Sequence, residues 1–97
     1  MYVAIGHLTL RLPENQSLKG KRQVLKSVIA RAHDRFGVSI AEVGSQELWQ
    51  LGELGIAYVS GDRRHAEDIL NQVVRYIEET RLDCELIGAD IDVIPAF

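Results

Sequence analysis

Apolar and polar residues repeat with two different periods along the chain. Four segments are rich in apolar side chains that alternate with polar ones or follow one another directly, as is typical of strands. These segments are residues 2–12, 38–44, 53–60 and 83–94. Residues 18–35 and 63–80 place apolar side chains at i, i+3 and i+4, the spacing of an amphipathic helix. The sequence therefore predicts the order strand, helix, strand, strand, helix, strand.

Turn and cap residues separate these segments. Pro13 ends the first strand, since proline cannot donate a hydrogen bond to a sheet ladder. Ser17 and Asp62 precede the helices and are expected to be their N-caps, and Gly37 is expected to end the first helix in a left-handed conformation. The alternation changes near Gly88, which indicates a β-bulge.

Right-handed crossovers and one central hairpin fold this order most simply into a ferredoxin-like βαββαβ sandwich of the α+β class. We expect a four-stranded antiparallel sheet with the first and third strands in its centre and both helices on one face. The 97 residues contain no linker, so 1–97 is expected to form a single domain. A composition of 46% hydrophobic and 26% charged residues is that of a globular protein.

The sheet face without helices is more apolar than a solvated face usually is. In the first strand, the alternate residues that point to this face begin with Val3 and Ile5. In the third strand, the alternate residues that point to either face are apolar. Self-association, with a dimer favoured, is one interpretation; scattered apolar atoms exposed on a monomer are the other. The candidate interface residues are Val3, Ile5, Tyr58 and Trp49. Packing against the core is favoured over partner contact for Trp49, because large aromatic residues usually bury their area.

Charge is distributed unevenly along the chain. Residues 17–35 hold six basic residues and one acid, a net charge of +5, and the rest of the chain carries −8. In the first helical turn the cations oppose the positive end of the helix dipole and stand beside free backbone N–H groups, an arrangement that attracts anions. The alternative is a solvated helix face. The candidate nucleic-acid or anion-binding residues are Lys19, Lys21, Arg22, Lys26, Arg11 and Arg31.

Three segments, 17–28, 35–50 and 54–65, resemble the YlxP-like family of small bacterial proteins. The matching motif positions are Ser17, Leu18, Lys19, Lys21, Arg22 and Trp49. The resemblance implies a ferredoxin-like fold, a cytoplasmic protein, and genes placed among translation and ribosome-maturation factors, but it implies no activity. Gly20 stands where we expect an acid, and Ser45 where many relatives carry Asp. The second departure weakens any proposal of a metal site in this loop.

Other chemistry finds little support in the sequence. The three histidines and Cys84 lack the spacing of metal ligands, and Cys84 is expected to be a small buried apolar residue. No phosphate-binding glycine loop, nucleophile with a base, signal peptide or membrane-spanning segment is recognised. Tyr58 is the only aromatic residue of the third strand, so bases are not expected to stack on the sheet.

We therefore predict a cytoplasmic protein without enzymatic activity, metal, cofactor or membrane contact. Its expected function is to bind RNA or the ribosome through the phosphates, using the basic first helix. The alternative is a homo-oligomeric interaction module that uses the open sheet face.

Overall fold

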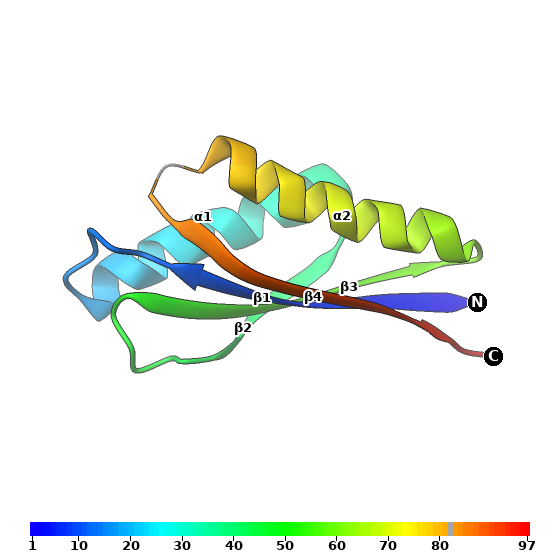
Figure 1. Ribbon diagram of the computed structural model, residues 1–97, viewed down its shortest axis with the longest axis horizontal. Coiled ribbons are helices and arrows are strands. Elements are labelled where there is room, and N and C mark those ends of the chain that lie inside the picture. Colours follow the sequence, from blue (N-terminus) through cyan, green and yellow to red (C-terminus); the bar gives the residue numbers. More distant parts are fainter. Residues whose placement is uncertain (82) are drawn as a thin grey trace.

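A computed structural model, which describes residues 1–81 and 83–97, confirms the predicted order and the ferredoxin-like fold. The elements are β1 (Tyr2–Arg11), α1 (Leu18–Phe36), β2 (Ser39–Gly44), β3 (Leu51–Ser60), α2 (Arg63–Thr80) and β4 (Glu85–Pro95). The strands form one antiparallel sheet in the order β2-β3-β1-β4, and both helices cover the same face of it (Figure 1). Among the described helices, none is both long and apolar enough to cross a bilayer.

The strand bounds differ from the predicted ones by one or two residues. β3 begins at Leu51 because its ladder with β1 continues to the pair Arg11–Leu51, beyond the apolar part of the strand. β4 begins at Glu85 because its ladder with β1 begins at the pair Arg11–Glu85, where β1 ends. Hydrogen bonding, and not apolar alternation alone, therefore sets both bounds.

The core lies between the sheet and the helices, as the two periodicities predict. Even-numbered residues of β1 face the helices, and the apolar stripes of α1 and α2 cover them. The fully buried side chains include Leu8, Leu10, Leu12, Leu54 and Leu70. Cys84 is buried beside them, as expected.

The predicted caps are all present. The Ser17 hydroxyl accepts a 3.0 Å hydrogen bond from Gly20 N, and the Asp62 carboxylate accepts one of 3.0 Å from His65 N. Gly37 ends α1 with φ of 69°, a conformation that favours glycine. The bulge predicted near Gly88 lies opposite β1: Thr9 pairs with Gly88 and Leu10 with Leu86.

The face opposite the helices carries the odd-numbered residues of β1, including Val3 and Ile5. Tyr58 does not lie on this face, so its assignment to an open-face interface was wrong. It pairs in register with the buried Ala4, and its hydroxyl lies 3.4 Å from His65 Nε2 of α2. Tyr58 shares the phase of Leu54 and Ile56, which places it under the helices.

Candidate nucleic-acid interface

Three of the predicted cations form an exposed row on one flank of α1. Lys19, Arg22 and Lys26 follow one another at intervals of three and four residues, so successive side chains point to the same side of the helix. All three are exposed. Within residues 1–81 and 83–97, no carboxylate oxygen lies within 4.0 Å of any of their charged nitrogens. We call these three residues the basic row.

Lys21 is not part of this surface, and its assignment as a phosphate-binding residue was wrong. The side chain is 1% exposed and points between α1 and the β2–β3 hairpin. Its Nζ donates hydrogen bonds to Ser45 O and, over 2.8 Å, to Leu48 O, and lies 3.3 Å from Glu42 Oε2. Two of the three ammonium protons are thus donated to carbonyl oxygens, and the Glu42 carboxylate supplies the opposite charge. Lys21 therefore holds the hairpin loop, residues 45–50, against the start of α1.

Arg11 is exposed but paired. Its guanidinium donates a 2.8 Å hydrogen bond to Glu85 Oε2 on the neighbouring strand, and both side chains are about half exposed. An exposed pair of this kind contributes little stability, yet it cancels the charge locally. Arg11 thus adds no net positive charge to the surface, contrary to its predicted role.

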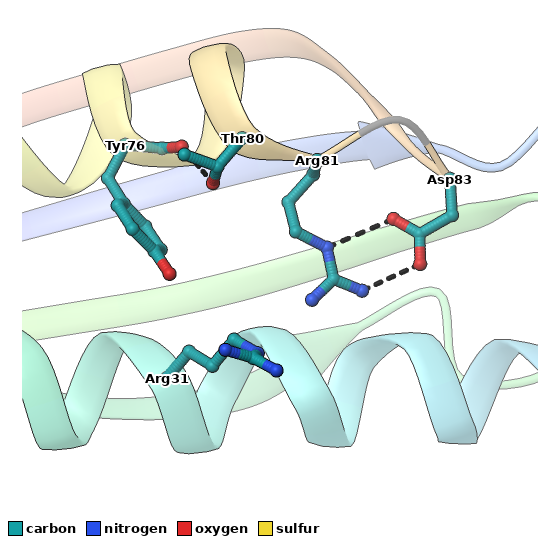
Figure 2. A pocket seen from close by; sticks show the side chains of 5 residues that line it. All are labelled: Arg31, Tyr76, Thr80, Arg81 and Asp83. Carbon is teal, nitrogen blue, oxygen red and sulfur yellow. Dashed lines mark hydrogen bonds and ion pairs between the residues drawn. The ribbon is translucent and has the colours of Figure 1, made fainter.

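Arg31 lies on the other flank of α1, away from the basic row. It lines a hollow of about 410 Å³ with Tyr76, Thr80, Arg81 and Asp83, and Figure 2 shows it reaching from α1 toward the end of α2. Arg81 is held by two hydrogen bonds to the Asp83 carboxylate, of 3.0 and 2.6 Å. These bonds lower the pKa of Asp83. Arg31 is therefore the cation of this hollow that no carboxylate of the described residues neutralises.

A second hollow, of about 300 Å³, adjoins the first and shares Tyr76 and Thr80 with it. Arg35 lines it, with its guanidinium carbon 4.9 Å from the centre of the Tyr76 ring. This distance is within the range of a cation–π contact. Sequence reasoning missed this part of the surface, because the contact joins the last turn of α1 to the C-terminal part of α2 and depends on how the helices pack.

Trp49 is 55% exposed, so the expectation that it packs against the core was wrong. It lies in the hairpin loop 45–50, which the bonds from Lys21 hold beside α1. The Asn15 amide donates to Trp49 O over 2.5 Å and to Ser17 O over 2.7 Å, and so fixes the indole-bearing backbone beside the N-cap of α1. The loop is thus anchored through its backbone, which leaves the indole at the surface.

The open sheet face holds one polar cluster. The Ser45 hydroxyl donates to one carboxylate oxygen of Glu53, and His7 Nε2 lies 2.9 Å from the other. These two hydrogen bonds lower the pKa of Glu53. In the part of the chain that the structure describes, no three His, Cys, Asp or Glu side chains converge as metal ligands would. Burial raises the pKa of the Cys84 thiol, which disfavours the reactive thiolate.

Comparison with known proteins agrees with this fold. The chain is similar over 98% of its length to part of the crystal structure of an amidase (hydantoinase/carbamoylase family) from Burkholderia phymatum, with a TM-score of 0.58 and 10% identity. It spans 28% of the length of that protein, and at this identity the likeness concerns the fold alone.

Sequence comparison reaches nearer relatives. The chain is 45% identical over 62 residues to the uncharacterized protein YlxP of Bacillus subtilis (strain 168). These aligned residues make up 64% of this chain and 67% of the relative. Residues 3–91 match the family described as "Protein of unknown function (DUF503)". This match covers nearly all of the chain and agrees with the resemblance seen in the motif around Ser17 and Trp49. The chain therefore belongs to the DUF503 family.

Proposed function

We propose that this protein binds RNA, including RNA of the ribosome, by contacting its phosphates, and that it acts as a binding protein and not as an enzyme. The observation that carries the proposal is the basic row of Lys19, Arg22 and Lys26. These cations are exposed and are not paired with any carboxylate among the described residues, although the protein as a whole has a net charge of −3. The proposal places the protein in the cytoplasm, where such RNA is found.

The geometry of the row suits a polyanion better than a single small anion. Seven residues of helix separate Lys19 from Lys26, which corresponds to about 10 Å along the axis. Successive phosphates of one strand can occupy such a row, whereas a lone phosphate can reach only part of it. Contacts of this kind are insensitive to base sequence and weaken steeply as salt rises, because binding releases condensed counterions.

The direct test compares two variants that remove the same amount of charge from different helices. Lys19→Gln/Arg22→Gln alters the basic row, and Arg63→Gln/Arg64→Gln removes two exposed cations from the start of α2. Binding of single-stranded RNA is measured by filter retention over a series of salt concentrations. We expect the α1 variant to bind more weakly and to reduce the slope of log K against log salt by roughly 1.4, about 0.7 for each lost phosphate contact. Equal losses in both variants, or wild-type protein that does not retain RNA, would overturn the proposal.

A second candidate function rests on the open sheet face. This face carries large apolar side chains that are 40–59% exposed, one from each of the four strands: Ile5, Val43, Val59 and Ile94. Val3 pairs in register with both Val59 and Ile94, so these three side chains form one apolar row across β3, β1 and β4. Contiguous exposed apolar side chains are typical of interaction surfaces. We propose a homodimer that joins two such faces as the alternative.

Sedimentation at micromolar concentration tests the dimer. Val59→Lys introduces a charge into the apolar row, whereas Ala30→Lys introduces the same charge on the exposed side of α1. We expect the wild type and Ala30→Lys to sediment as dimers and Val59→Lys as a monomer. A monomeric wild-type protein would dispose of this candidate and leave the RNA proposal intact.

A further inference from the structure

We propose that Trp49 is a stacking platform for an unpaired base of bound RNA, next to the phosphates that Lys19 and Arg22 hold. The inference rests on the proposed RNA-binding function and narrows it to RNA with unpaired bases. It is carried by the exposure of the indole, by the rigidity of its loop, and by its place beside the basic row.

The loop presents its apolar side chains to solvent. Trp49 and Leu48 are both about half exposed, although burial of their side chains in the core would be favourable. Together with Arg11, Gln50 and Leu51 they line a shallow hollow of about 540 Å³. An aromatic face on the wall of such a hollow is a surface on which unpaired bases stack in RNA complexes.

The loop is held rigidly despite its exposed side chains. The buried ammonium of Lys21 accounts for two of its hydrogen bonds, to Ser45 O and Leu48 O. Gln50 Nε2 adds two more, to Pro13 O over 3.3 Å and to Asn15 O over 3.0 Å. A loop that is ordered before binding loses little conformational entropy on binding, which favours a recognition role for the side chain that it presents.

The platform and the basic row meet at the start of α1. One amide group, that of Asn15, donates both to Trp49 O and to O of Ser17, the N-cap residue. Lys19 follows two residues later in the first turn. Figure 1 shows the β2–β3 hairpin loop and the beginning of α1 at the same end of the molecule. A strand whose phosphates lie on Lys19 and Arg22 can therefore place an adjacent base against the indole.

Stacking on an aromatic side chain requires a base that is not held in a duplex. Single-stranded RNA offers such bases, and stacking tolerates any base because each has a π face. A duplex can still place its phosphates on the basic row but gains nothing from Trp49. The proposal thus predicts preference for unpaired over paired RNA, with no preference for a base sequence.

The sole tryptophan of the chain serves as its own probe, since all indole fluorescence comes from position 49. Intrinsic fluorescence and filter retention are recorded while a short oligouridylate or a blunt-ended RNA duplex is added. We expect the oligouridylate to quench the emission and the duplex to bind with little quenching. Trp49→Leu should weaken oligouridylate binding roughly tenfold to a hundredfold, leave duplex binding unchanged and keep the salt slope, whereas Trp49→Phe should retain most of the affinity.

The outcomes separate the two proposals. Retained RNA without quenching, or a Trp49→Leu variant that binds oligouridylate as the wild type does, would overturn the stacking platform while the phosphate-binding function stands. A wild-type protein that binds neither RNA overturns both. Trp49 contributes only its backbone oxygen to the loop's hydrogen bonds, so replacing the side chain leaves these bonds available.

Discussion

Lys21 places a positive charge in the interior, and every acceptor around it comes from β2 or the hairpin loop that follows. Two backbone carbonyls accept hydrogen bonds from its Nζ, and Glu42 Oε2 forms an ion pair with it at 3.3 Å. Among the described residues, no group donates a hydrogen bond to this buried carboxylate oxygen. Removing one partner of a buried pair leaves the other charge uncompensated, which is strongly destabilising. Lys21 thus stabilises the fold, and by holding the hairpin loop it also fixes the position of Trp49, the residue proposed to stack on a base.

We therefore expect Lys21→Met to lower the free energy of unfolding by about 3–5 kcal/mol, because the two carbonyls lose their donor and Glu42 loses its counter-charge. Lys26→Met, at an exposed position on the same helix, should change it by less than about 0.5 kcal/mol. Urea unfolding followed by circular dichroism measures both. Equal stability of the two variants would contradict the structural role of Lys21.

Glu53 predicts a dependence of stability on pH. The hydrogen bonds from Ser45 and His7 lower its pKa below the ordinary value of 4.5 in the folded protein. A depressed pKa contributes stability that is present above the unfolded value and is lost as pH falls through the folded one. The difference in unfolding free energy between wild type and Glu53→Gln should therefore be largest above pH 4.5 and shrink below it.

Urea unfolding at a series of acidic pH values measures that difference. Glu47→Gln, in the hairpin loop that precedes β3, is the matched control, because the described residues offer its carboxylate no hydrogen bond. Above pH 4.5, Glu53→Gln should lose more stability than this control does. A Glu53→Gln difference that stays constant across the same range would count against the cluster on the open face.

At the scale of elements, local signals suffice for the frame of the fold but not for the site. Ser17, Gly37 and Asp62 mark helix ends through chemistry that acts within three or four residues, so the sequence predicts them. Lys21 and Trp49 depend on contacts across 24 or more residues of chain, from α1 and from Asn15 to the hairpin loop. Lys21 follows Leu18 by three residues and precedes Leu25 by four, so its place beside the apolar stripe of α1 can be read from the sequence. Its acceptors belong to another element, and only the tertiary structure shows them.

The start of α1 is coupled to the hairpin through Gly20. A Cβ atom at this position would lie 2.2 Å from Asn15 Oδ1, so Gly20 leaves room for the amide that joins the two segments. Alanine favours a helix over glycine by about 1 kcal/mol, but displacing Asn15 forfeits two hydrogen bonds of about 1 kcal/mol each. Gly20→Ala should therefore destabilise the wild type by about 1 kcal/mol and stabilise an Asn15→Ala variant by a similar amount.

A double-mutant cycle, with unfolding free energies for the two single variants and the double variant, measures this change of sign. Additive effects would mean that Asn15 and Gly20 do not share the space, and would remove the proposed link between the first turn of α1 and the loop of Trp49.

At the scale of the molecule, the basic row and the apolar row lie on opposite sides of the sheet. The basic row belongs to the helical layer, and the apolar row of Val3, Val59 and Ile94 lies on the face that no helix covers (Figure 1). Two copies joined through their open faces would present their helices outward on both sides. Each dimer would then carry two basic rows, available to the same RNA only if the strand is long enough to reach both.

This arrangement predicts that dimerisation strengthens binding to long RNA alone. A second site engaged by the same strand acts at a raised effective concentration, which increases the apparent affinity without any new contact. Val59→Lys should thus bind a short oligouridylate as the wild type does, yet lose about tenfold to a hundredfold in affinity for long polyuridylate. Filter retention with the two RNAs measures the difference, beside Asn71→Lys as the charge-matched control, because this exposed position lies on α2 and not on the helix that carries the basic row. Equal losses for short and long RNA would show that Val59 affects the RNA site itself, and the two surfaces would then not be independent.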